Sequence, residues 1–274
     1  MNTYESNGTT LSYDEAGEGL PVVFLHPTPL DHEFWRPVAE NLEGVRAILP
    51  DLRGHGESEL GEGLPVGAFR AVSDAPALTV AQLATDILEL LDHLMIPKAI
   101  FAGCSIGGYV LLEIWRRAPE RVQGLAFVCS KPQPDAEANL PRRFSMIEGA
   151  RNGLLKEIYD EMAISLIGNT ARWRRPEILA EVKSRMTVTP EAFEAVQAGL
   201  ATRPDSLPTV ETIKVPVLAI AGGEDNGVTP DEMQAFHNAP GGCTFHLLLD
   251  AGHLAAYEQP VKVSSLMAEW LRKF

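Results

Sequence analysis

The apolar residues of the chain gather in six short runs, and the segments between the runs carry apolar residues at helical spacing. Each run is continuously apolar instead of alternating, which is typical of strands covered on both faces. Helices are predicted at residues 79–94, where Leu and Ile recur every three or four positions, and at residues 261–271. This alternation predicts an α/β fold with a mostly parallel central sheet flanked by helices. The predicted strands are residues 22–26, 45–51, 99–104, 124–129, 215–221 and 244–249.

A long stretch between the fourth and fifth predicted strands has no strand pattern and is rich in Arg, Glu, Leu and Met. Closely spaced prolines mark its two ends, Pro132 and Pro134 at the first and Pro204 and Pro208 at the second. Because proline interrupts regular structure, we expect the chain to leave and re-enter the core at these points. The predicted organisation is a core of residues 1–130 and 206–274 with an inserted helical cap of residues 131–205. Residues 59–76, which are rich in glycine, are predicted to form a loop or small insertion.

The composition is that of a folded globular chain, with 45% hydrophobic and 22% charged residues among 274. Lys and Arg number 23 against 37 Asp and Glu, so the net charge is −14. A charge of this sign is unfavourable for binding to nucleic acid or to an anionic membrane surface. We therefore expect a small molecule as the partner, with no nucleic acid and no membrane. The oligomeric state is left open.

The start of the chain, MNTYESNG, has neither the basic nor the apolar stretch of a signal peptide. Its cysteines, Cys104, Cys129 and Cys243, are odd in number and widely spaced, which is typical of reduced thiols. A cytoplasmic protein is therefore predicted. The sequence contains no HExxH, paired CxxC, GxGxxG or Walker pattern, so no metal and no cofactor are expected.

The most specific chemical signal is the GxSxG sequence of residues 103–107, which falls where an apolar strand gives way to a helical pattern. A serine on such a tight turn exposes its hydroxyl at the end of the sheet, and small neighbours let strand and helix approach closely. Ser105 is therefore the predicted nucleophile. Ile106 begins the helix, so its backbone N–H is a predicted donor to an oxyanion.

A serine hydroxyl needs a general base, and that base needs a carboxylate to orient it. His253 fits the base, because it lies in a loop directly after the last predicted strand, whereas the other six histidines fall in strands, helical patterns or loops with simpler structural explanations. Asp225 is the predicted acid, since it follows the strand before that one. Glu224 stays open as an alternative, because the loop after it could turn either carboxylate inward.

The second oxyanion donor is expected in the loop after the first predicted strand, residues 26–31, which read His-Pro-Thr-Pro-Leu-Asp. Pro27 and Pro29 have no N–H, so Thr28 is the predicted donor. The Thr28–Pro29 peptide bond is predicted to be cis, which would aim this N–H.

These stretches, together with residues 50–58 (PDLRGHGES), 118–122, 221–230, 251–254 and 258–260, resemble the α/β-hydrolase superfamily along essentially the whole chain. The chain is similar to its carboxylesterase and 3-oxoadipate enol-lactonase-like branch. The order Ser105, Asp225, His253 is also that of the α/β-hydrolase triad. The resemblance implies a cofactor-independent hydrolase with a helical cap. Two positions depart from the pattern: Pro27 replaces a glycine, and three residues instead of two separate Asp225 from Thr229.

The sequence thus predicts a serine esterase or lactonase with a Ser-His-Asp triad. A carbon–carbon bond hydrolase, a cofactor-free perhydrolase or haloperoxidase, and an acyltransferase use the same triad and stay open. A ligand-binding protein that kept the fold without turnover is the alternative from a different class. The apolar residues of the cap are predicted either to wall the pocket or to form the cap's own core; they are Phe144, Met146, Leu166, Ile167, Trp173 and Met186.

Overall fold

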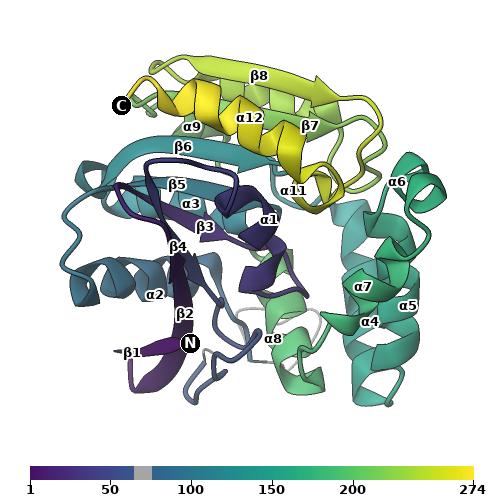
Figure 1. Cartoon of the computed structure of the whole chain (residues 1–274). Coiled ribbons are helices and arrows are strands. Elements are labelled where there is room, and N and C mark those ends of the chain that lie inside the picture. Colours follow the sequence, from purple (N-terminus) through teal and green to yellow (C-terminus); the bar gives the residue numbers. More distant parts are fainter. Residues whose placement is uncertain (65–75) are drawn as a thin grey trace.

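The computed structural model describes residues 1–64 and 76–274. In this part of the chain a central sheet of eight strands runs in the order β1-β2-β4-β3-β5-β6-β7-β8 (Figure 1). The six strands from β4 to β8 in this order are parallel, while β1 and β2 run antiparallel to their neighbours. The strands are β1 (Asn2–Ser6), β2 (Thr9–Ala16), β3 (Leu20–Leu25), β4 (Val45–Pro50), β5 (Ala99–Cys104), β6 (Val122–Val128), β7 (Val217–Gly222) and β8 (Cys243–Leu248).

The six predicted strands are all present, with ends shifted by at most two residues. The hairpin of β1 and β2 was not predicted, because its few buried apolar residues, such as Tyr4 and Leu11, alternate with polar ones and form no continuous run. The predicted interruption at residues 59–76 lies largely outside the described residues.

Both faces of the parallel strands are buried, which explains their continuous apolar character. Within β3, Val23 and Leu25 belong to the hydrophobic cluster that packs under helices α2 and α3. The alternate residues Val22 and Phe24 belong to a second cluster with residues of α1 and α12 on the opposite face. A strand side chain points to one face and its neighbour to the other, so both positions must be apolar. The predicted α/β class with a flanked, mostly parallel sheet is confirmed.

The helices follow the strands as the periodicity predicts, and those at residues 79–94 and 261–271 are present as α2 and α12. The helices outside residues 131–205 are α1 (Arg36–Ala39), α2 (Val80–His93), α3 (Ile106–Arg117), α9 (Leu207–Val210), α10 (Pro230–Met233), α11 (Ala255–Glu258) and α12 (Pro260–Leu271). Short 3₁₀ turns lie at His32–Phe34, Pro119–Arg121, Glu137–Asn139 and Gln234–Asn238.

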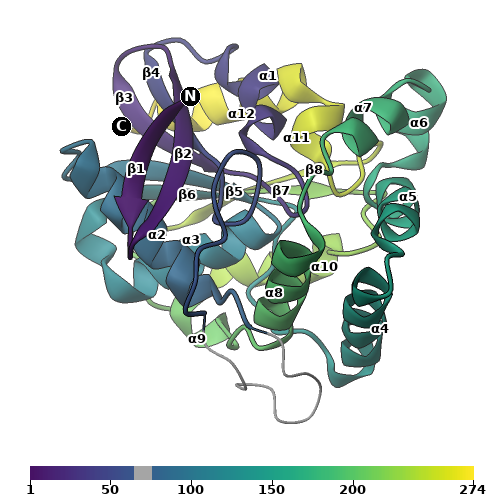
Figure 2. The same ribbon diagram turned by 90° about the horizontal axis from the view of Figure 1, so that it is seen from below.

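A run of five helices connects β6 to the short helix α9 before β7, within the stretch predicted as a cap. These helices lie beyond the carboxyl ends of the parallel strands (Figure 1), and α8 packs against α4 (Figure 2). The last helix of the run also joins the core, since the Ala195 carbonyl accepts the Leu78 N–H at 2.9 Å. The five are α4 (Leu140–Arg151), α5 (Leu155–Leu166), α6 (Asn169–Arg174), α7 (Ile178–Ser184) and α8 (Pro190–Ala201).

Candidate active site

Ser105 lies on a strained turn between β5 and α3, with φ 52° and ψ −117°. Non-glycine residues rarely adopt this conformation, and it concentrates at functional sites. The turn is possible because its neighbours are glycines: a Cβ on Gly107 would lie 2.3 Å from the Leu25 carbonyl oxygen, and one on Gly103 would lie 2.4 Å from the carbonyl carbon of Gly107. The Ser130 hydroxyl donates to the Ser105 carbonyl at 2.8 Å and holds the turn in place.

His253 and Asp225 come together from the loops after β8 and β7. The Nδ1 atom of His253 lies 2.8 Å from Asp225 Oδ2, and the Asp225 side chain is fully buried. The other Asp225 oxygen, Oδ1, accepts the N–H groups of Gly227 and Val228 at 2.7 and 3.0 Å. These two bonds hold Asp225 Oδ1 against the loop that leads to Thr229, which is one residue longer than the family pattern. Asp225 Oδ2 therefore still faces His253 despite the longer loop.

The pair is electrostatically matched. Burial alone would lower the pKa of His253, but the charge of Asp225 and its hydrogen bond outweigh burial and hold this pKa above its ordinary value. Burial alone would raise the pKa of Asp225, but the charge of His253 and the hydrogen bonds to the carboxylate hold it below its ordinary value. Asp225 therefore keeps the proton of His253 on Nδ1 and leaves Nε2 free to accept one.

Glu224, the alternative acid, has a different set of contacts. Its carboxylate accepts the N–H of Thr170 at 2.8 Å and the Thr170 hydroxyl at 2.5 Å. It thus binds the first turn of α6 and not His253, which faces Asp225.

The loop after β3 brings Thr28 to the same place and is held by two buried histidines. The Thr28 hydroxyl lies 2.9 Å from Nε2 of His55, whose Nδ1 lies 3.0 Å from the Arg53 carbonyl. A carbonyl only accepts, so Nδ1 of His55 carries the proton and the Thr28 hydroxyl donates to Nε2. Burial lowers the pKa of His55, in agreement with a neutral ring.

His26 fixes the start of this loop in the same manner. Its Nε2 accepts the Leu52 N–H at 2.9 Å, and burial lowers its pKa to about 3. The Pro27 carbonyl accepts the Leu30 N–H at 3.0 Å, which closes the turn, and the Thr28–Pro29 peptide bond is cis as predicted. Pro27 is therefore part of an ordered turn.

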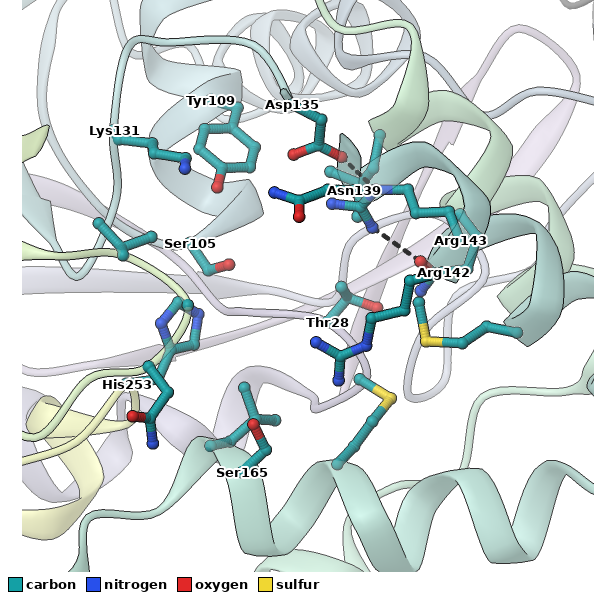
Figure 3. A pocket seen from close by; sticks show the side chains of 18 residues that line it. Thr28, Ser105, Tyr109, Lys131, Asp135, Asn139, Arg142, Arg143, Ser165 and His253 are labelled. Carbon is teal, nitrogen blue, oxygen red and sulfur yellow. Dashed lines mark hydrogen bonds and ion pairs between the residues drawn. The ribbon is translucent and has the colours of Figure 1, made fainter. Parts of the chain in front are cut away.

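Ser105, His253 and Thr28 share a cavity of about 260 Å³, and Figure 3 shows the side chains that line it. Ser105, His253 and Thr28 line its sheet side, and residues of α4 and α5, among them Arg142 and Ser165, line the opposite side. Asp225 lies behind His253, and Ile106 is the first residue of α3, whose first-turn N–H groups have no partner within the helix. All five residues predicted for the site thus lie at or next to one cavity.

Comparison with known proteins places the chain in a family. The family model for the alpha/beta hydrolase family matches residues 22–266. The chain belongs to this family. One relative of this α/β hydrolase is the 3-oxoadipate enol-lactonase 1 of Acinetobacter baylyi, 26% identical over 270 residues that cover 97% of this chain and 94% of the relative.

Solved structures agree with this placement. An esterase from Thermogutta terrifontis with malate bound has a TM-score of 0.88 and 32% sequence identity, over 99% of this chain and 96% of its own. The enol-lactonase from Burkholderia xenovorans has a TM-score of 0.87 over 99% of this chain and 100% of its own; at 24% identity it shows the likeness of fold alone. The predicted resemblance to the enol-lactonase-like branch is confirmed.

The apolar residues of the predicted cap divide between the two places expected for them. Met146 and Leu166 line the cavity, Ile167 and Met186 are buried in a core cluster, and Trp173, which is 81% exposed, does neither. His55, interpreted as surface or structural packing, contacts Thr28. Glu258, quoted only as part of the family resemblance, is bonded to the residue before His253.

Among the described residues, no three His, Cys, Asp or Glu side chains gather in a way that could hold a metal ion. Among the same residues, no helix has the length and apolar character needed to cross a bilayer.

Proposed function

We propose that this α/β hydrolase is a serine hydrolase that cleaves a carboxylic ester or lactone through an acyl-enzyme. The observation that carries the proposal is the 2.8 Å hydrogen bond from His253 to Asp225, next to a cavity that His253 shares with Ser105. The names of the relatives, an enol-lactonase and an esterase, support a carbonyl–oxygen bond as the one that breaks. A small cavity also suits a small-molecule substrate.

The proposed reaction has two halves. Nε2 of His253 takes the Ser105 proton while the serine oxygen bonds to the substrate carbonyl carbon, and the N–H groups of Thr28 and Ile106 bind the resulting oxyanion. The tetrahedral intermediate then expels the alcohol oxygen, which takes the proton from His253, and leaves the acyl group on Ser105. In the second half, water gives a proton to His253 while its oxygen bonds to the acyl carbon. The bond from this carbon to the Ser105 oxygen then breaks, the serine oxygen takes the proton back from His253, and the acid is released. Asp225 stabilises the imidazolium that forms in each half.

We also propose that residues 131–205 act as the cap over this reaction. Its α4 and α5 supply one wall of the cavity, including Met146, Met162 and Leu166. A wall on a separate segment selects the substrate, while the sheet side carries the chemistry.

The described cysteines are all free, in agreement with a reducing, cytoplasmic setting.

The first experiment compares the wild type with Ser105→Ala on p-nitrophenyl acetate and on a phosphonate probe. Ser145→Ala is the matched control, because Ser145 is an exposed serine on α4 whose hydroxyl bonds only the Pro141 carbonyl. We expect hydrolysis and a single probe adduct in the wild type and in Ser145→Ala. Ser105→Ala should lose the adduct and about 10³-fold or more of kcat.

Other outcomes point elsewhere. A folded wild type that neither turns over nor labels would reject the esterase and favour a ligand-binding role. Labelling without ester hydrolysis would move carbon–carbon bond cleavage and perhydrolysis forward, and a panel of vinylogous diketones and of esters with hydrogen peroxide would separate these two.

A further inference from the structure

Glu258, the last residue of α11, is a buried carboxylate outside the proposed reaction. Its side chain lies directly behind the loop that carries His253. The Oε2 atom accepts the N–H of Gly252 at 2.8 Å and the N–H of Gly168 at 3.2 Å. Gly252 immediately precedes His253, and Gly168 lies just after α5. One oxygen thus connects the His253 loop to the helical segment.

The turn at residues 166–170 is bonded to the sheet loops at two further points. The N–H of His253 donates to the Leu166 carbonyl at 2.9 Å. Thr170 donates its N–H and its hydroxyl to Glu224, the neighbour of Asp225. The turn therefore contacts the residues beside both His253 and Asp225.

Glycine at two positions makes this contact possible. A Cβ on Gly252 would lie 2.3 Å from the Gly168 nitrogen, and a Cβ on Gly168 would lie 2.9 Å from Glu258 Oε2. Both distances are below any real carbon contact, so larger side chains would push the two backbones apart. The close approach is what allows one carboxylate oxygen to receive both N–H groups.

The same helix that ends at this turn forms part of the cavity wall. Met162, Ser165 and Leu166 of α5 line the cavity opposite Ser105 and His253. A bond network at the end of α5 therefore joins the substrate-facing wall to the proposed general base.

We propose that Glu258 is a positioning residue for His253: its carboxylate binds the His253 loop to the turn after α5, so that the base and the cavity wall are held as one unit. The effect on catalysis rests on the proposed function, in which His253 is the general base, whereas the hydrogen bonds of Glu258 do not depend on it. Glu258 does not reach the reacting atoms itself; it acts through the backbone of Gly252.

Several charged groups face His253 and Glu258 and affect their pKa values. His253 faces Asp225 and Glu258, which raise its pKa, and Lys131 from the segment after β6, which lowers it. Glu258 faces Glu224, and burial is the largest cause that raises its pKa to about 7. The thiols of Cys104 and Cys129 also approach this loop, donating to the His253 and Gly252 carbonyls, and burial raises their pKa, so they stay neutral.

The test compares Glu258→Gln and Glu258→Ala with the wild type. Gln keeps an oxygen to accept both N–H groups but removes the charge, whereas Ala removes both. The matched control is Asp250→Asn, since Asp250 is a half-exposed carboxylate on the same loop that pairs with Arg174 at the surface. Solvent screens the Asp250 charge, so its loss should leave His253 unchanged.

The first measurement is the pKa of the His253 imidazole by NMR titration of histidine-labelled protein, with the signal assigned by its absence in His253→Ala. Because the Glu258 pKa is about 7, this residue is charged mainly in the upper part of the titration. Losing that charge disfavours the imidazolium, so the His253 pKa should fall by up to about half a pH unit in Glu258→Gln and stay unchanged in Asp250→Asn. This measurement needs no turnover.

The second measurement is kcat and KM for p-nitrophenyl acetate. We expect Glu258→Ala to lower kcat about tenfold with KM nearly constant, and Glu258→Gln to recover most of kcat above the His253 pKa. A purely structural role would lower the melting temperature of both variants while the His253 pKa and the kcat of the folded enzyme stayed at wild-type values, and that result would overturn the proposal.

The two proposals fail in distinguishable ways. If the wild type has no Ser105-dependent activity but the His253 pKa still falls in Glu258→Gln, the proposed function is wrong and the positioning by Glu258 stands. If the esterase is active and both Glu258 variants match the wild type in pKa and kcat, the positioning role is rejected alone.

Discussion

The sheet wall and the helical wall of the cavity are held in place by different interactions. On the sheet wall, Ser105 is fixed by a strained backbone turn, and His253 by a buried hydrogen bond to Asp225. On the helical wall, Arg142 is exposed and Arg143 is held by an ion pair to Asp135 and a hydrogen bond to Gln197 (Figure 3). Buried bonds and backbone geometry leave little freedom, whereas a long exposed side chain such as that of Arg142 can rearrange.

The difference assigns separate tasks to the two walls. The reacting groups must be held within a fraction of an ångström, which suits the rigid sheet wall. Substrate selection tolerates some movement of side chains, which suits the helical wall. The turn at residues 166–170 is where hydrogen bonds join the two walls, the one from Gly168 to Glu258 being buried. Changes on the sheet wall should therefore alter kcat, and changes on the helical wall should alter KM.

The largest effect on the sheet wall is expected from Asp225→Asn. The amide cannot hold the Nδ1 proton of His253 as the carboxylate does, so kcat should fall about 10²- to 10⁴-fold. The pH profile gives a second signature. Asp225 holds the His253 pKa above 6.5, and the base must be neutral, so wild-type kcat/KM should rise with pH through that pKa. In Asp225→Asn this rise should move to lower pH.

The same two pKa shifts predict how the stability of the folded protein depends on pH. Because the folded-state pKa of His253 is raised, its stabilising contribution is complete below pH 6.5 and is lost as pH rises through the raised pKa. Asp225, with a lowered pKa, contributes above pH 3.8 and loses this contribution as pH falls through the lowered value. Thermal melts of the wild type and of Asp225→Asn between pH 3 and pH 9 would show the pH range in which the pair stabilises the fold.

An Asp225→Asn variant with wild-type kcat would contradict the assignment of Asp225 as the acid.

A smaller effect is expected from Thr28→Val on the oxyanion loop. Valine keeps the shape and the backbone N–H but removes the hydroxyl that His55 accepts at 2.9 Å. A buried acceptor left without its donor costs about 1–3 kcal/mol, part of which will appear as movement of the loop. We expect kcat to fall about tenfold with little change in KM, as measured on p-nitrophenyl acetate.

Thr28→Ser is the control for this variant, because it restores the hydroxyl and should recover most of the activity. If Thr28→Val is as active as the wild type, the His55 contact does not position the loop, and this part of the sheet wall is not held rigidly by buried bonds.

The smallest effect is expected on the helical wall, from Arg143→Met. Met keeps the aliphatic stem but removes the ion pair to Asp135 and the 2.7 Å bond to Gln197 of α8. We expect KM for p-nitrophenyl butyrate to change about threefold and kcat to change less, because Asp135 keeps its second ion pair, to the buried Arg203 at 2.6 Å. A tenfold loss of kcat would instead show that the helical wall also controls reaction geometry.

The sequence was sufficient where the structure depends on local pattern. Continuous apolar runs located the parallel strands, because both faces of β3 are buried, and the glycines around Ser105 located the turn between β5 and α3. The order of strands and loops also indicated the region of Asp225 and His253. The hairpin of β1 and β2 was not predicted, since its alternation is too weak a signal.

Only the tertiary structure shows which of Asp225 and Glu224 contacts His253. Both residues follow β7, and the sequence does not say which carboxylate turns inward. The structure turns Asp225 to His253 and Glu224 to Thr170, which is 54 residues away along the chain. The contacts of Thr28 with His55 and of Glu258 with Gly168 are of the same kind.

The amino-acid sequence by itself therefore determined the layers, the turn that carries Ser105 and the order of the proposed site residues. These depend on hydrophobic periodicity and on backbone sterics, which act over a few residues. Tertiary structure alone decided which carboxylate meets His253, which residues of the segment 131–205 face the cavity and which buried groups support the loops. Those contacts join segments that are distant along the chain, and a side chain's partner there depends on packing that no local pattern records.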